Sequence, residues 1–287
     1  LSNKEFDEVK KHNELLFISP SNILPEFTNN IISIGISLES QLIALSKFIK
    51  KQKKNKTVLL YPNNEYANLI EKKINLLNLK KFKTFKYNPN PEVLTGEIET
   101  LTNYSQRKRN LELRKKMYED KEDEQSIKEL ERLDQLYTLG GVNFDSVIII
   151  DFGDNLKSVL TSLVYTDVDQ TKVLFTTVNQ WFDESIFYEN TIKTIYYPSV
   201  NYKEFKKFNK NYYKRFETFP NEITILAYDA LGLIYYVWKK NGKINSINDF
   251  SFKNKIKGKI GTFSFKDKKV IQDLEIYKTE KNKFIKF

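Results

Sequence analysis

The sequence alternates between short runs of apolar residues and longer segments in which apolar residues recur every three or four positions. Short runs that are apolar throughout are typical of strands buried on both faces, and the longer spacing is typical of amphipathic helices. The predicted strands cover residues 15–18, 31–34, 57–61, 82–85, 146–150 and 172–176. The predicted helices cover residues 37–49, 65–77 and 155–165. This alternation predicts an α/β protein with a mostly parallel sheet flanked by helices.

The longest predicted helix lies near the C-terminus. Residues 222–240 form an aromatic-rich apolar segment that ends at Gly242, and glycine is the residue that most often follows the end of a helix. Short apolar segments follow at 258–265, 274–277 and 283–285, and they predict strands. An ordinary buried helix followed by a hairpin would give the same pattern.

Residues 104–138 are unusually rich in charge. The first half is basic and the second half is acidic, with a break near Glu122, so the segment predicts two helices that pair antiparallel. Their apolar positions form a narrow stripe, which is too small for a core. Two interpretations stay open: a solvated elaboration of the fold, or a protruding surface that binds a partner.

The chain of 287 residues has a formal net charge of +10, which raises the question of a nucleic-acid partner. Only five of its 47 basic residues are arginine, and arginine is the residue that recognises phosphates and bases in a bidentate manner. The lysine runs, such as residues 50–56, are not interleaved with aromatic residues that could stack on bases. We therefore expect a solvated basic surface and no nucleic-acid partner.

Motifs for catalysis are not found in the sequence. There is no cysteine and only one histidine, His12, and no P-loop, G-x-G-x-x-G or G-x-S-x-G motif occurs. Asp145, Asp151 and Asp154 could hold a cation, but acids at strand ends more often cap the next helix, and Asp154 is placed to do so. The sequence predicts a protein that is not an enzyme and needs no cofactor or metal.

Several segments resemble one known family. The A-Y-D-A-L sequence at 227–231, followed by G-x-x-G-x-x-x-F at 258–265, resembles the closing signature of type I periplasmic binding proteins of the leucine-binding kind. Residues 14–22 and 56–74 resemble strands of the same family. An insertion at 104–138, and the later Trp181, resemble the branch of penicillin-binding protein activators, which are outer-membrane lipoproteins that stimulate peptidoglycan synthases.

The resemblance implies two lobes of parallel sheet flanked by helices. Residues 1–36 and 220–287 are expected to form a partial first lobe, and 37–219 a second lobe that carries the helical hairpin insertion 104–138. The opening strands of the family have no counterpart here, so one lobe is expected to be incomplete in this chain. We expect either a fragment of a longer protein or a missing half that is supplied elsewhere.

The resemblance also implies a ligand cleft between the lobes, beyond the carboxyl ends of the strands. The candidate ligand-binding residues are Ser19, Ser21, Tyr61, Tyr66, Phe152, Gly153, Asn179 and Trp181. By resemblance, Ser19 and Ser21 would hold a ligand carboxylate and Tyr66 would be a cleft tyrosine. No acidic residue follows Asn179 before Asp183, which disfavours specificity for an amino acid.

Two functions follow from the resemblance. The first is a regulator of peptidoglycan synthesis in the periplasm or on the outer membrane, with a synthase as partner and an eroded cleft. The second is a substrate-binding receptor of an ABC transporter, with a permease as partner and a small polar ligand such as an amino acid in a closed cleft. The apolar runs are far shorter than the ~20 residues that span a bilayer. Membrane contact is therefore expected only through an N-terminal lipid anchor outside these residues.

Overall fold

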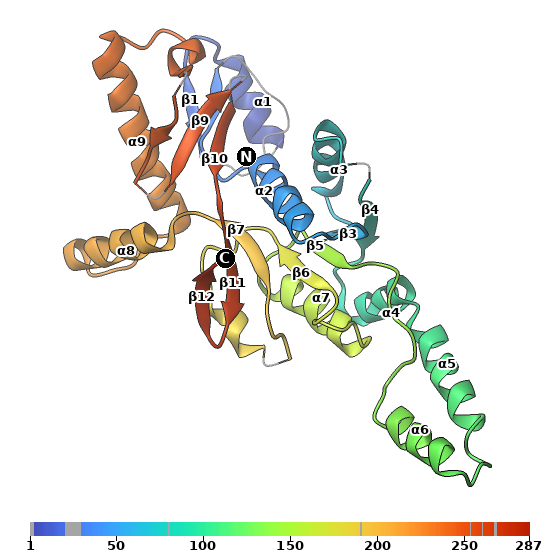
Figure 1. Cartoon of the computed structure of the whole chain (residues 1–287). Coiled ribbons are helices and arrows are strands. Elements are labelled where there is room, and N and C mark those ends of the chain that lie inside the picture. Colours follow the sequence, from blue (N-terminus) through green and yellow to red (C-terminus); the bar gives the residue numbers. More distant parts are fainter. Residues whose placement is uncertain are drawn as a thin grey trace.

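The computed structural model describes residues 3–20, 30–79, 81–189, 191–252, 254–259, 261–266 and 269–287. A seven-stranded sheet with the order β12-β11-β7-β6-β5-β3-β4 lies at its centre (Figure 1). The strands are β3 (Thr57–Pro62), β4 (Lys83–Tyr87), β5 (Ser146–Ile149), β6 (Leu174–Thr177), β7 (Tyr196–Ser199), β11 (Glu275–Glu280) and β12 (Lys283–Lys286). Strands β3 to β7 run parallel to one another in this sheet. Strand β11 is antiparallel to both of its neighbours, β7 and β12.

Helices cover both faces of this sheet, as the apolar strands predict. They are α2 (Leu38–Lys51), α3 (Ala67–Leu76), α4 (Pro91–Thr102) and α7 (Gly153–Tyr165). Alternate residues of β3 point to opposite faces: Leu59 packs with α2 and α3, whereas Val58 and Leu60 pack with α4 and α7. The predicted α/β class with a mostly parallel sheet is therefore confirmed.

A smaller region contains the N-terminal strands and the long helix near the C-terminus (Figure 1). Its elements are α1 (Asn3–Lys11), β1 (Phe17–Ser19), β2 (Ile31–Ser33), α9 (Glu222–Asn241), η2 (Ile247–Phe250), β8 (Ile256–Lys257), β9 (Thr262–Lys266) and β10 (Lys269–Asp273). Strands β1 and β2 are parallel, and β8 to β10 form an antiparallel sheet. Ile32 of β2, Val237 of α9 and Phe263 of β9 share one apolar core, so these distant segments fold together.

The last two strands do not stay in this smaller region. Strand β10 is followed after Leu274 by β11, which pairs with β7 of the large sheet through Tyr277 and Tyr197. Assigning all of residues 220–287 to the first lobe is therefore wrong for β11 and β12. The apolar pattern identifies a strand, but hydrogen bonding to a distant strand decides which sheet it joins.

The ends of two helices illustrate what the sequence does and does not predict. Helix α9 ends as predicted at Gly242, whose φ of +72° is readily adopted only by glycine. The predicted cap of α7 by Asp154 is wrong, because the helix already begins at Gly153 and has no side-chain cap. Asp154 instead lies in the first turn, where a negative charge interacts favourably with the helix dipole.

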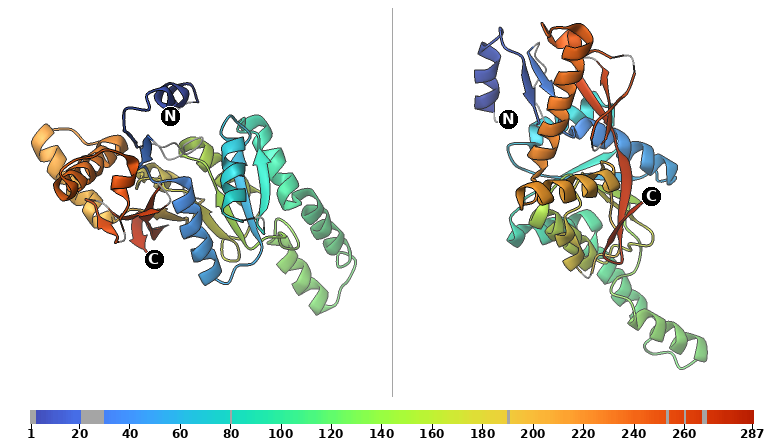
Figure 2. Two further views of the ribbon diagram at one scale, coloured as in Figure 1. Left: turned by 90° about the horizontal axis from the view of Figure 1, so that it is seen from above. Right: turned by 90° about the vertical axis from the view of Figure 1, so that its left-hand side faces the viewer.

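The charged segment folds into α5 (Tyr104–Lys116) and α6 (Glu124–Asp134), which extend away from the sheet in both views of Figure 2. We call residues 104–138 the charged hairpin. An ion pair joins Lys115 to Asp134 across the two helices, at 2.7 Å. Only Leu111 and Leu133 among its large apolar side chains are buried.

The base of the charged hairpin is attached to the body by Arg107. This guanidinium is buried and donates hydrogen bonds to the carbonyl oxygens of Thr166 and Asp167, at 3.2 and 2.8 Å, and to the hydroxyl of Thr138, at 2.7 Å. Burial lowers the pKa of the guanidinium, but arginine remains charged in proteins because its pKa lies far above neutral pH. The hairpin is thus anchored at its base and extended at its tip.

Two further elements complete the described fold, η1 (Glu184–Tyr188) and α8 (Tyr202–Phe216). Among the described residues, no helix combines the length and the apolar content that crossing a bilayer requires.

Candidate ligand cleft

The carboxyl ends of the parallel strands meet at one edge of the large sheet, where α/β proteins bind ligands. Asp151 follows β5 at this edge and is buried. Its Oδ2 accepts a hydrogen bond from the hydroxyl of Tyr87, and its Oδ1 accepts one from the amide of Phe152, at 2.8 Å. Burial raises the pKa of the Asp151 carboxyl and, with the nearby carboxylate, also raises the pKa of the Tyr87 phenol. Because the two groups satisfy each other, they form a structural link between β4 and β5.

Asn179, a candidate ligand residue after β6, is also used inside the protein. Its backbone N–H donates to Oε1 of Gln41 on α2, at 2.7 Å. Its side-chain Oδ1 accepts a hydrogen bond from the hydroxyl of Ser199, at 2.8 Å. The same Oδ1 accepts from the amide of Trp181. Asn179 therefore joins α2, β6 and β7, and both its oxygen lone pairs have partners.

Tyr61 and Tyr66 are placed differently from each other. Tyr61 is buried in the core under α3, and its hydroxyl donates to Oε1 of Glu71, at 3.0 Å. Burial, and then this partner, raise the pKa of Tyr61 to about 12. Tyr66 precedes α3 and is 48% exposed, so its ring is accessible to a ligand.

The remaining candidates lie at or after the ends of strands in both regions of the protein, and one of them lies outside the described residues. Phe152 is half-exposed, and Gly153 adopts a φ of +54° with no atom within 4 Å of the position that a Cβ would occupy. Trp181 is half-buried, and its ring contacts that of Phe205, with 6.4 Å between the centroids. Ser19 is buried at the end of β1. Ser21 lies outside the described residues.

Two polar residues that build this edge are not among the candidates predicted from the sequence. Gln180 donates to the carbonyl oxygen of Asp151 at 3.1 Å, and Gln41 donates to that of Ile36 at 2.8 Å. Gln41 could have been recognised from the sequence, because it is a polar residue on the apolar helix face that contains Leu38 and Leu42. Burial of such a residue implies a hydrogen-bond partner, although its identity needs the fold.

The three acids considered for a cation do not converge. The Asp145 carboxylate accepts the backbone N–H groups of Asn55 and Lys56 before β5 begins, whereas Asp151 follows the end of that strand. Asp154 projects into solvent from α7. Within the described part of the chain, no group of three or more histidine and acidic side chains could hold a metal ion.

A polar cavity of about 360 Å³ lies where the chain passes from β10 to β11. It is lined by cations and anions from both parts of the protein, including Lys257, Lys259, Glu204, Asp273 and Glu275. Its charged lining therefore has no strong excess of either sign. None of the seven candidate ligand residues that the structure describes lines it.

The solved structures that this chain resembles include binding proteins and a regulator. The leucine-, isoleucine-, valine-, threonine- and alanine-binding protein of Brucella ovis matches 100% of this chain and 74% of its own length, with a TM-score of 0.66 and 13% identity. An extracellular ligand binding receptor of Desulfohalobium retbaense matches 98% of this chain, with a TM-score of 0.60 and 11% identity. The fold is that of type I periplasmic binding proteins.

The same fold occurs in the C-domain of LpoA from Haemophilus influenzae, a regulator of PBP1A. That domain matches 100% of this chain and 80% of its own length, with a TM-score of 0.54 and 10% identity. The chain spans 45% of the length of the Desulfohalobium receptor. No family model and no curated protein sequence matches the chain.

The predicted resemblance to type I periplasmic binding proteins is thus confirmed at the level of the fold. At identities this low, the likeness shows the fold alone. Identities of 10–13% carry neither a ligand nor a partner from any of them to this chain.

Proposed function

We infer that this protein is a non-enzymatic regulator at the cell envelope that binds a peptidoglycan synthase through its charged hairpin. The observation that carries the inference is a contrast between two regions. At the sheet edge, the carboxylate of Asp151 and the backbone N–H and Oδ1 of Asn179 are bonded within the protein, whereas the hairpin tip extends into solvent. LpoA, which has the same fold, regulates PBP1A.

The state of the cleft supports a regulator. A receptor for a polar solute needs polar groups that converge on the ligand with free donors and acceptors. Here Tyr61 donates to Glu71, and Asn179 bonds to Gln41 and Ser199. A ligand would have to break these bonds, and each broken bond that leaves a buried group unpaired costs about 1–3 kcal/mol.

The surface of the charged hairpin supports a protein partner. Large apolar side chains are exposed along it between the charges: Leu113, Met117, Ile127 and Tyr137. Apolar side chains within a polar rim are typical of protein interfaces, and the charges steer association and select the partner. Its basic α5 and acidic α6 present both signs to that partner.

Replacing residues 112–132 with a short Gly/Ser linker tests this proposal. The linker keeps Arg107, Leu111 and Leu133, so the melting temperature is expected to change by only a few degrees. Capture of the synthase ectodomain from the same cell is expected to be lost. A full replacement of 106–136 would also remove Arg107 and is expected to destabilise the protein.

A matched control separates the hairpin from exposed apolar residues in general. Leu76 on α3 is exposed to a similar degree as Leu113, and Leu76→Ser is expected to leave capture unchanged. Retention of capture by the linker variant would refute the assignment of the hairpin as the binding surface.

A second candidate function is a substrate-binding receptor of an ABC transporter, with a permease as partner. The accessible ring of Tyr66 and the open backbone at Gly153 favour it, together with the fold of the Brucella amino-acid-binding protein. In that case a ligand with micromolar affinity, present at millimolar concentration, is expected to stabilise the protein by about 4 kcal/mol.

A thermal-shift screen of amino acids and peptidoglycan fragments checks this alternative, with Tyr66→Ala as the variant. If Tyr66 contacts the ligand, the shift is expected to shrink strongly in Tyr66→Ala, because aromatic burial is lost. If the protein is a regulator with no small-molecule ligand, none of these compounds is expected to shift its melting temperature.

A further inference from the structure

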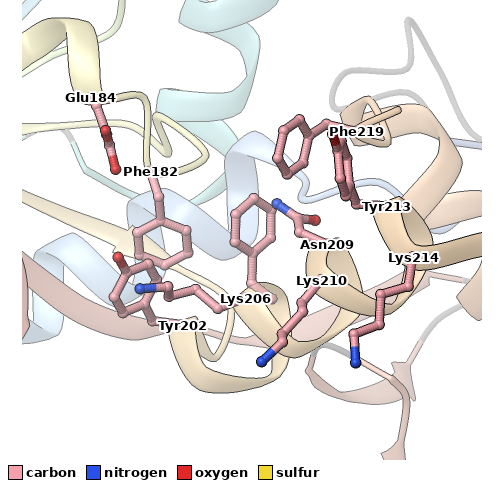
Figure 3. Close-up of a pocket in the computed structure, with 10 residues that line it drawn as sticks. Phe182, Glu184, Tyr202, Lys206, Asn209, Lys210, Tyr213, Lys214 and Phe219 are labelled. Carbon is pink, nitrogen blue, oxygen red and sulfur yellow. The ribbon is translucent and has the colours of Figure 1, made fainter. Parts of the chain in front are cut away.

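A groove of about 560 Å³ follows one face of α8 (Figure 3), and Trp181 is the predicted cleft residue whose ring contacts its lining, at Phe205. Aromatic rings occupy both of its ends. Phe182 packs against Tyr202 and Phe205 at one end, with centroid distances of 4.6 and 5.2 Å. Tyr213 and Phe219 stack at the other end, at 4.8 Å, and Phe219 is 68% exposed. The groove therefore offers apolar ring faces to a ligand.

Three lysines follow the same face of α8 at intervals of four residues: Lys206, Lys210 and Lys214. The first and the last are eight residue steps apart, which is about 12 Å along a helix axis. Among the described residues, none of the three forms an ion pair, and Figure 3 shows them on the same side of the groove. An extended ligand with several negative charges would neutralise them.

This arrangement corrects one expectation from the sequence. The lysine-rich segments are not all separate from exposed aromatic residues, because on α8 the helical spacing places the two kinds of side chain on one face. The alternation is hard to recognise in the linear sequence, where Lys206 and Lys207 are adjacent but only Lys206 lines the groove.

Asn209 indicates the chemistry of the ligand further. It lies between the two aromatic ends, and its Oδ1 is buried without a hydrogen-bond donor among the described residues. A buried acceptor without a partner is unusual and is satisfied by a donor from a ligand. The carboxylate of Glu184 is a second acceptor on the groove wall. Phosphate groups supply only acceptors, whereas sugar hydroxyl and acetamido groups supply donors.

We propose that the groove along α8 binds an acidic oligosaccharide. The apolar faces of its sugar rings lie on Phe205, Tyr213 and Phe219, and its carboxylates pair with the three lysines. A hydroxyl or acetamido N–H donates to Oδ1 of Asn209. This site is separate from the charged hairpin, so the proposal does not depend on the regulator function.

Isothermal titration with a tetrasaccharide of galacturonic acid tests the site. Lys206→Gln/Lys210→Gln/Lys214→Gln is expected to weaken binding about tenfold, because three ion pairs with the ligand are lost together. The matched control Lys203→Gln/Lys207→Gln/Arg215→Gln removes the same charge from other faces of α8, and is expected to change the affinity less than about twofold. Tyr213→Ser/Phe219→Ser is expected to weaken binding to a similar degree as the first variant.

Three other probes define the outcomes that overturn the proposal. Neutral chitotetraose is expected to bind more weakly than the acidic tetrasaccharide, and equal binding would contradict the role of the lysines. Tighter binding of a single-stranded oligonucleotide or of anionic lipid vesicles would assign the groove to another ligand class. Equal losses in the two lysine variants would show an effect of net charge rather than a site. If the triple variant fails to fold, Lys210→Glu gives the same comparison.

Discussion

Arg107→Met is expected to lower the free energy of unfolding by about 3–5 kcal/mol. Methionine fills most of the same space but donates no hydrogen bond. The substitution would leave the carbonyl oxygens of Thr166 and Asp167 and the hydroxyl of Thr138 without the donor that they now have. Thr138 and Thr166 are buried with Arg107, so water cannot replace their lost bonds without opening the base of the charged hairpin.

Arg109→Met is the matched control, because Arg109 lies on the same helix and is exposed. Its effect is expected to stay within about 0.5 kcal/mol. Chemical denaturation of both variants measures the difference. Equal stabilities would contradict the view that Arg107 anchors the hairpin to the body.

Tyr87→Phe is expected to lower the free energy of unfolding by about 1–3 kcal/mol at neutral pH, because Asp151 loses the hydroxyl that its carboxylate accepts from. Tyr197→Phe is the control. Both rings are fully buried in the same core cluster, but the Tyr197 hydroxyl has no partner among the described residues. Removing that hydroxyl is expected to be neutral or stabilising.

The effect of Tyr87→Phe is expected to depend on pH. The folded-state pKa of Asp151 is raised above its ordinary value, so the folded protein holds this proton more tightly than the unfolded chain. The stability from the protonated form is fully present below the ordinary pKa and is lost as the pH rises through the raised pKa. Because the Tyr87 hydrogen bond lowers that pKa, its removal makes this loss larger.

Denaturation curves at about pH 4 and about pH 7 check this linkage. The difference between wild type and Tyr87→Phe is expected to be larger at the higher pH, while that between wild type and Tyr197→Phe is expected to stay constant. If Tyr87→Phe lowers the free energy of unfolding by the same amount at both pH values, the Tyr87 hydrogen bond does not change the pKa of the Asp151 carboxyl.

The strands and helices of the large sheet could be predicted because burial on both faces leaves a local mark on the sequence. The run Val147–Ile150 is apolar at every position, and both faces of β5 are covered. The end of α9 was also local, since Gly242 alone specifies it. Secondary structure and fold class follow from such short-range signals.

The sheet edge and the hairpin base could not be predicted because they depend on partners far away in the sequence. Arg107 stands among exposed charges, yet its acceptors include Thr166 and Asp167. From the sequence, Tyr87 is predicted to be an apolar core residue. It contacts Asp151 because β4 and β5 pair with opposite edges of β3. No local pattern encodes such contacts.

Site-specific photo-crosslinking tests the central claim, that the charged hairpin is the surface that binds a peptidoglycan synthase. A photoreactive amino acid would replace Leu113 on α5 or Ile127 on α6, both exposed, and Leu76 on α3 as the control. If the hairpin is the binding surface, the two hairpin positions crosslink to the synthase and Leu76 does not. A crosslink from Leu76 alone, or from none of the three with the synthase present and bound, would contradict it.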